Sequence, residues 1–198
     1  MRAGVTALTS AMLGLTSTGT SSARVDLRTP AAFRAYLEGR WRVNKRLDYA
    51  TPAEWRGTMS GVVTVAPRSS QPSVLMWHEE GEMCLDARPA LSIATHKNLA
   101  FQCRDDWPVS VFFVDGEVTD ARDDGWGVAK GQGLFVELAP DRGGVVQFSF
   151  DHLCINDMYS GAMVFESPER FRWSWTIRGP KKDGHIIQEF ERLHPEET

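Results

Sequence analysis

The sequence predicts an all-β protein, an antiparallel up-and-down barrel of about 8–10 strands that follows one short N-terminal helix. Apolar and polar residues alternate with a period of two along about ten segments, which is the pattern of half-buried strands. Short turn-forming sequences such as Asp115-Gly116 separate successive segments, which favours antiparallel neighbours. Because a long meander would leave exposed strand edges, we expect the sheet to close on itself.

The helix is expected immediately before the first strand. Thr29 has the character of an N-cap and Pro30 suits the first helical position, and apolar residues follow at helical spacing as far as Leu37. After Gly39 the period changes from 3.6 to 2. One face of this first strand is expected to carry Trp41, Val43, Lys45 and Leu47.

The remaining strands are expected along the rest of the chain, in one domain that spans residues 26–198. They are predicted at residues 57–66, 73–85, 90–103, 109–114, 117–121, 133–138, 145–154, 158–165, 171–178 and 185–193. Residues 122–144 are rich in Gly and Asp around Trp126 and are predicted to contain a loop insertion within the barrel.

Composition excludes several classes of protein. With 198 residues, 42% hydrophobic residues and 24% charged residues, the chain has the composition of a globular domain and not of a disordered one. The net charge of −4 argues against a protein that binds nucleic acid mainly through phosphates. No apolar run reaches the roughly 18 residues of a transmembrane helix, so none is predicted.

Residues 1–25 differ from the rest of the chain. They include nine Ser or Thr residues, two Arg residues and no acidic residue. This composition is typical of an organellar transit peptide, and a disordered leader is the alternative. The protein is expected in the mitochondrial matrix if the segment is a transit peptide, and otherwise in the cytoplasm.

Strand parity places polar residues at one end of the predicted barrel. His152 and Cys154 share a strand face with two phenylalanines, and Asp157 and Tyr159 lie on the matching face of the next strand. Alternate turns of a meander lie at the same end, so the turn at residues 179–184 should border this end too. The predicted ligand-binding residues are therefore His152, Cys154, Asp157, Tyr159, Lys182 and Asp183.

Three functions remain open for this end of the barrel. The preferred one is non-enzymatic binding of a small apolar or amphipathic molecule in a cavity with a polar mouth. The first alternative is an acid–base enzyme of isomerase, cyclase or hydrolase type that uses His152, Asp157 and Tyr159 as catalytic residues. The second is a structural or interaction subunit whose barrel is filled and whose polar residues satisfy the turn backbone.

No cofactor or metal is predicted, because the cysteines and histidines lack the paired spacing that organises a zinc site. The three cysteines are expected to be free thiols. A protein partner stays possible but unspecified, and no nucleic acid partner is expected.

Gly39-Arg40-Trp41, directly after the predicted helix, resembles the Gly-x-Trp signature of lipocalin-like (calycin) barrels. The resemblance implies that Trp41 closes one end of the barrel and that a basic residue of the last strand packs across its ring, a role that falls to Arg192. Gly39, Trp41 and Arg192 are thus the predicted closure of a lipocalin-like barrel.

A second resemblance covers residues 33–193. The pattern His78-Glu79-Glu80-Gly81, then His152-Leu153-Cys154, then Trp173-Ser174-Trp175 is similar to an uncharacterised family of lipocalin-like barrels, a domain of unknown function. This resemblance implies the fold and names no activity. On a strand, Glu79 and Glu80 should project to opposite faces.

Overall fold

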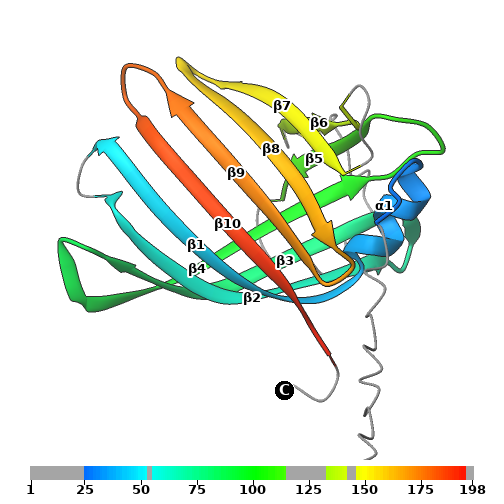
Figure 1. Ribbon diagram of the computed structural model, residues 1–198, viewed down its shortest axis with the longest axis horizontal. Coiled ribbons are helices and arrows are strands. Elements are labelled where there is room, and N and C mark those ends of the chain that lie inside the picture. The colour runs from blue at the N-terminus through cyan, green and yellow to red at the C-terminus, as the bar shows by residue number, and fades with distance from the viewer. Residues whose placement is uncertain (1–24, 53–54, 115–132, 142–145, 195–198) are drawn as a thin grey trace, which may run out of the picture.

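The computed structural model describes residues 25–52, 55–114, 133–141 and 146–194. In this part of the chain one helix precedes ten strands (Figure 1). The elements are α1 (Pro30–Leu37), β1 (Gly39–Thr51), β2 (Gly57–Arg68), β3 (Gln71–Leu85), β4 (Arg88–Gln102), β5 (Val109–Phe113), β6 (Leu134–Leu138), β7 (Gln147–Cys154), β8 (Asp157–Ser167), β9 (Arg170–Arg178) and β10 (Asp183–Leu193).

All ten strands belong to one antiparallel sheet in the order β6-β5-β4-β3-β2-β1-β10-β9-β8-β7. Apart from β6 and β7, strands that are consecutive in sequence pair with each other. The first strand, β1, also pairs with the last strand, β10, so that both lie in the middle of the sheet. The edge strands of the sheet are β6 and β7. They lie next to each other, but no ladder of backbone hydrogen bonds joins them in the described residues. Asp141 links the two sides, because its carboxylate accepts hydrogen bonds from Ser149 and its N–H donates to Gln147. The prediction of an all-β, antiparallel up-and-down barrel of about 8–10 strands after one short helix is confirmed, and the barrel is nearly closed.

The helix forms where its capping residues predicted it. The Thr29 hydroxyl accepts a hydrogen bond from the Ala32 N–H at 3.2 Å, and Pro30 occupies the first turn. Phe33 and Leu37 on the inner face of α1 are fully buried. Helix α1 therefore closes one end of the barrel.

Aromatic side chains fill the half of the lumen next to α1. The Phe33 ring contacts those of Phe101, Phe148 and Phe165, with centroids 5.4–6.3 Å apart. Deeper in the barrel, the Trp77 ring packs edge-on against the rings of Trp173 and Phe190. Leu27, just before α1, is also buried in this core.

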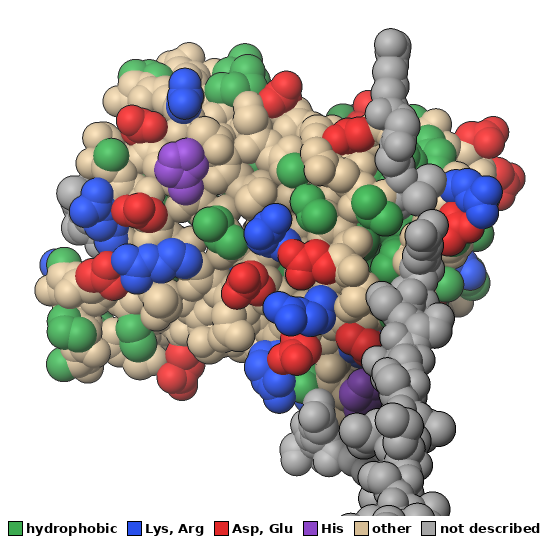
Figure 2. All heavy atoms as spheres, in the orientation of Figure 1, with side chains coloured by type: hydrophobic (Ala, Val, Ile, Leu, Met, Phe, Trp, Pro, Cys, Tyr) green, Lys and Arg blue, Asp and Glu red, His purple; other side chains and the backbone are tan. Residues whose placement is uncertain are grey.

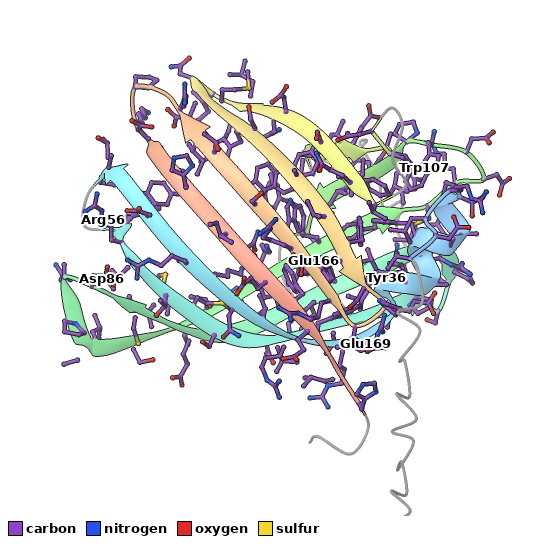
Figure 3. All side chains as sticks on the ribbon, viewed as in Figure 1. Tyr36, Arg56, Asp86, Trp107, Glu166 and Glu169 are labelled. Atoms are coloured by element: carbon purple, nitrogen blue, oxygen red, sulfur yellow. The ribbon has the colours of Figure 1, made fainter. Side chains whose placement is uncertain are left out.

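The two ends of the barrel differ in composition. Figure 3 shows Tyr36 and Trp107 at the helical end, whereas Arg56 and Asp86 lie at the opposite end. Tyr36 donates a hydrogen bond to the carbonyl of Ser167, which ties α1 to the turn between β8 and β9. The outer face over β1 and β10 carries intermixed acidic and basic side chains (Figure 2). Arg42 of β1 forms an exposed ion pair with Glu191 of β10.

The strand predicted at residues 133–138, inside the segment 122–144, forms as β6 (Leu134–Leu138), whose backbone pairs with β5 and whose alternate side chains pack in the core. Residues 115–132, which include the predicted strand at 117–121, lie outside the described residues, as do residues 1–24. No helix in the described part of the chain has the length and apolar character that a membrane crossing requires.

Candidate ligand-binding cavity

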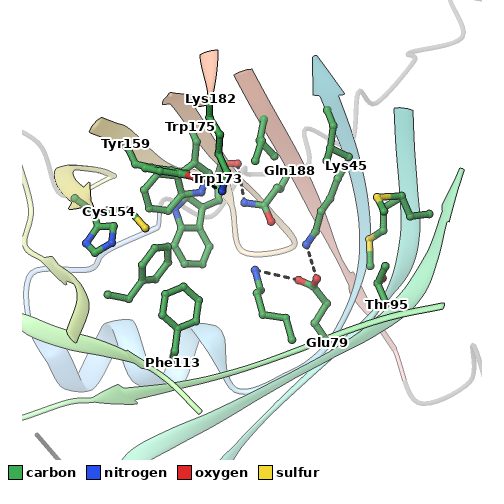
Figure 4. A pocket seen from close by; sticks show the side chains of 17 residues that line it. Lys45, Glu79, Thr95, Phe113, Cys154, Tyr159, Trp173, Trp175, Lys182 and Gln188 are labelled. Atoms are coloured by element: carbon green, nitrogen blue, oxygen red, sulfur yellow. Dashed lines mark hydrogen bonds and ion pairs between the residues drawn. The ribbon is translucent and has the colours of Figure 1, made fainter. Parts of the chain in front are cut away.

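A cavity of about 400 Å³ occupies the half of the barrel away from α1 (Figure 4). Every strand of the sheet contributes to its lining, so the cavity is the unfilled part of the lumen. Its walls are of two kinds. Aromatic side chains come from β5, β6, β8 and β9, and a charged cluster comes from β1, β3 and β4.

Rings in mutual contact form the aromatic wall. The centroid of the Phe135 ring lies 5.1 Å from that of Trp175 and 4.3 Å from that of Phe113. Trp173 and Trp175, which alternate with polar residues along β9, are both buried. Such rings fix one another in place, so the wall offers a rigid apolar surface.

The mouth of the cavity carries most of the polar residues that strand parity placed there. His152, Cys154, Tyr159 and Lys182 all line the cavity. Lys182 Nζ donates a hydrogen bond to Tyr159 Oη at 3.1 Å, and this bond raises the pKa of Lys182. Burial against Phe135 and its neighbours lowers the pKa of His152.

Asp157 and Asp183 do not line the cavity. Asp157 is buried, but its Oδ1 accepts hydrogen bonds from the backbone N–H groups of Lys181 and Lys182 and so holds the turn between β9 and β10. Asp183 is exposed and lies opposite Arg178 in the β9–β10 ladder. Within the described residues no hydrogen bond joins Asp157 to His152, so the structure does not assemble the acid–base pair considered from the sequence.

The charged cluster lies inside the barrel. Lys45 Nζ donates a hydrogen bond to Glu79 Oε1, and Lys97 Nζ lies 3.4 Å from Glu79 Oε2. The Glu79 side chain is 3% exposed and that of Lys45 12% exposed. Lys97 Nζ also lies 5.5 Å from the centroid of the Trp173 ring, which joins the cluster to the aromatic wall.

Burial and mutual charge shift the titration of this cluster. Burial lowers the pKa of Lys45 to about 7, and the positive charge of Lys97 adds to the shift, while Glu79 opposes it. Burial alone would raise the pKa of Glu79, but the two ammonium groups of Lys97 and Lys45 outweigh it and hold this pKa below its usual value. Glu79 therefore stays ionised at neutral pH.

Sequence reasoning missed this cluster, although a signal was present. Lys45 has the parity of Trp41 and Val43, Glu79 that of Trp77, and Lys97 that of Leu99. A charged residue on the face that also carries the core residues points into the lumen. The expectation that the adjacent glutamates project to opposite faces is confirmed, since Glu79 faces inward and Glu80 outward.

The described residues include no group of three or more His, Cys, Asp or Glu side chains that could hold a metal ion. Cys84, Cys103 and Cys154 are free thiols.

The family described as "Family of unknown function (DUF6314)" matches residues 37–192. The chain belongs to this family. The DUF6314 match runs from the end of α1 to Arg192, so it includes every strand that lines the cavity. A search of the curated proteins finds no significant match.

Among solved structures, the DUF6314 chain is similar to the S-type phycobiliprotein lyase CPES from Guillardia theta. The TM-score is 0.56 at 10% identity, and the match covers 84% of this chain and 93% of the lyase chain. At this identity the likeness concerns the fold. EF1p2_mFAP2b, solved bound to DFHBI, matches with a TM-score of 0.39 at 12% identity over 80% of this chain and 95% of its own. A de novo designed fluorescence-activating β-barrel matches with a TM-score of 0.38 at 12% identity over 81% of this chain and 96% of its own.

Proposed function

We propose that this protein is a non-enzymatic binder of a small apolar or amphipathic molecule, which it holds in the cavity of the barrel. The observation that carries the proposal is the cavity itself, about 400 Å³ bounded by a rigid aromatic wall and a few convergent polar groups. Small-molecule pockets have volumes of about 300–1,000 Å³ and this kind of lining.

The distribution of side chains in the lumen separates this proposal from the alternative of a filled barrel. Small barrels are often filled by their own side chains. Here the aromatic core fills only the half next to α1, and the half toward Tyr159 and Lys182 stays hollow. A barrel that serves only as a scaffold has no need of the hollow half, since packing would add stability there.

The positions of the polar residues favour binding over acid–base catalysis. The acid–base site considered from the sequence pairs the imidazole of His152 with the carboxylate of Asp157. The carboxylate of Asp157 instead holds the turn of Lys181 and Lys182. The similarity to the S-type phycobiliprotein lyase supports the barrel fold.

A fluorescence titration with 1-anilinonaphthalene, an uncharged apolar probe, tests the proposal. We expect saturable binding of one probe per chain, with an increase in fluorescence as the dye leaves water. Native mass spectrometry of protein purified from its own cells complements the titration, since a retained small molecule would identify the ligand itself.

A pair of adjacent substitutions locates the bound probe. Cys154 lines the cavity, whereas Leu153 points outward with 62% of its surface exposed. Cys154→Phe should fill the mouth and abolish most of the binding, and Leu153→Phe should leave it unchanged. Equal affinities of the two variants, or absence of saturable binding both of this probe and of its sulfonated form 1-anilinonaphthalene-8-sulfonate, would overturn the proposal.

A further inference from the structure

The charged cluster in the cavity has an excess of positive charge. Two ammonium groups, those of Lys45 and Lys97, face the single carboxylate of Glu79. One of the two lysines would suffice to neutralise the carboxylate. A surplus buried charge is costly unless a partner compensates it, so the cluster has room for one further negative group.

Both ammonium groups also keep hydrogen-bonding capacity. Each ammonium carries three N–H donors, and Glu79 takes one from Lys45. Figure 4 shows Lys45 and Glu79 on one side of the cavity and Tyr159, Trp173 and Trp175 on the other. An anionic group near the lysines would therefore leave the rest of a ligand against the aromatic rings.

We propose that the ligand carries one anionic group, of carboxylate or sulfonate type, that binds at Lys45 and Lys97 while its flat apolar body lies against Trp173 and Trp175. This inference rests on the proposed function and names the chemical class of its ligand. The opposite arrangement, with the anion at Lys182 in the mouth, is less favourable, because Lys182 already donates to Tyr159 and is less buried than Lys45.

Two probes with the same ring system test the inference. The neutral probe is 1-anilinonaphthalene and the anionic probe is 1-anilinonaphthalene-8-sulfonate, so the two differ only in the sulfonate. We expect the wild-type protein to bind the anionic probe about tenfold more tightly or better, as a charge-assisted hydrogen bond in a buried site implies.

Substitutions in the cluster should change this preference in opposite directions. Lys45→Met leaves Glu79 paired with Lys97, so it removes the surplus charge without leaving the carboxylate alone, and we expect it to abolish the preference. Glu79→Gln keeps the shape and adds to the positive charge, so we expect it to strengthen the preference. The preference is measured in each variant as the ratio of the two affinities, so that a change in the shape of the cavity, which affects both probes, does not enter it.

Lys181→Met is the matched control. Lys181 is exposed beside the mouth and does not line the cavity. Its replacement by Met changes the net charge of the protein by the same amount as Lys45→Met does. We expect it to leave both affinities unchanged. Because Glu79→Gln and Lys45→Met act in opposite directions, a folding defect in either variant leaves the other as a test, with circular dichroism as the check on folding.

The preference should also depend on pH. Since the pKa of Lys45 is lowered to about 7, the surplus charge is present below this pH and is lost above it. The affinity for the anionic probe should fall as the pH rises from about 6 to about 9, and the affinity for the neutral probe should not follow it over that range.

The groups that face Lys45 come from several strands. They are Glu79 from β3 and Lys97 from β4 and, across the cavity, His152, Cys154, Tyr159 and Lys182. From its neighbours β2 and β10 the described lining residues are the uncharged Met59, Ile186 and Gln188.

The possible outcomes are distinct. Equal binding of both probes by the wild-type protein, or a preference that survives Lys45→Met, would overturn the anionic ligand and leave the proposed function standing. A preference that Lys182→Met removes and Lys45→Met does not would also overturn it, by moving the anion to the mouth. Failure of both probes to bind would instead overturn the proposed function.

Discussion

The guanidinium carbon of Arg192 lies 4.1 Å from the centroid of the Trp41 ring, so the last strand closes over the first. Arg192 also donates hydrogen bonds to the carbonyls of Glu38 and Tyr36, at 2.9 and 2.5 Å, which ties both strands to α1. Gly39 takes a φ of +122°, and a Cβ there would lie 3.0 Å from Arg192 Nη1. The Gly-x-Trp pattern therefore has a physical reason: glycine leaves room for the arginine that covers the tryptophan.

Replacement of Arg192 should destabilise the barrel. Arg192→Met would remove the cation–π contact with Trp41 and leave backbone carbonyls of α1 without their donor, a loss of about 2–4 kcal/mol in the free energy of unfolding. Urea denaturation measures the change. Arg42→Met is the control, because Arg42 forms an exposed ion pair with Glu191 and its loss should cost less than about 1 kcal/mol. Similar losses in the two variants would contradict the role of Arg192 as the barrel closure.

Asp157 should affect stability and not binding. Asp157→Ala would leave the N–H groups of Lys181 and Lys182 without their acceptor, and we expect a loss of about 1–3 kcal/mol in the free energy of unfolding. Asp157→Asn keeps an acceptor oxygen and should lose less. The affinity of the folded variants for 1-anilinonaphthalene should equal that of the wild type. A variant with normal stability and no binding would place Asp157 in the site.

His152 should make binding of an uncharged ligand sensitive to acid. Because burial lowers its pKa, the imidazole is neutral at pH 7 and becomes charged as the pH falls below its ordinary range. The charged ring would stand in an apolar cavity, so the affinity for 1-anilinonaphthalene should decrease on acidification, and bound probe should lower the pKa of His152 further. NMR titration of the imidazole and probe binding at several pH values measure both effects. If His152→Gln keeps the acid sensitivity, another group is responsible.

Alternation of apolar and polar residues predicted the fold because it shows, within each strand alone, which side chains face the inside of the barrel. Phe148 and Phe150 are buried and His152 and Cys154 of the same face line the cavity, as their parity implies. Parity also placed Asp157 on an inward face, but no local pattern shows which partner a buried carboxylate takes. Here the partners belong to a turn more than 20 residues later in the chain.

The charged cluster shows a second limit of sequence reasoning. Lys45, Glu79 and Lys97 come from three strands, and Lys45 and Glu79 are 34 residues apart in sequence. The parity of each residue indicates an inward face, but it does not show that the three side chains meet. Only the pairing of β1 with β2, β2 with β3 and β3 with β4, together with the curvature of the sheet, brings them to one wall.

Lys45 should give the stability of the ligand-free protein a characteristic pH dependence. Its pKa is about 7 in the folded protein, against an ordinary value of 10.5, because burial disfavours the ammonium form. Between these two pH values the unfolded chain binds the proton and the folded chain does not. The free energy of unfolding must therefore rise with pH across this window, by at most about 1.4 kcal/mol per pH unit for one proton.

Urea denaturation of the wild type and of Lys45→Met between about pH 6 and 9.5 measures this dependence, and the difference between the two proteins isolates Lys45. Below about pH 7 the wild type keeps a surplus ammonium group in the lumen at a cost in free energy, so Lys45→Met should be the more stable protein. As the pH rises the wild type should gain on the variant, because its ammonium loses the proton on folding. Tyr49, whose pKa burial raises to about 12, stays neutral in the folded state over this range and contributes little to the difference. Parallel curves for the two proteins would mean that Lys45 keeps an ordinary pKa, and the cluster would then carry its surplus charge at every pH of the experiment.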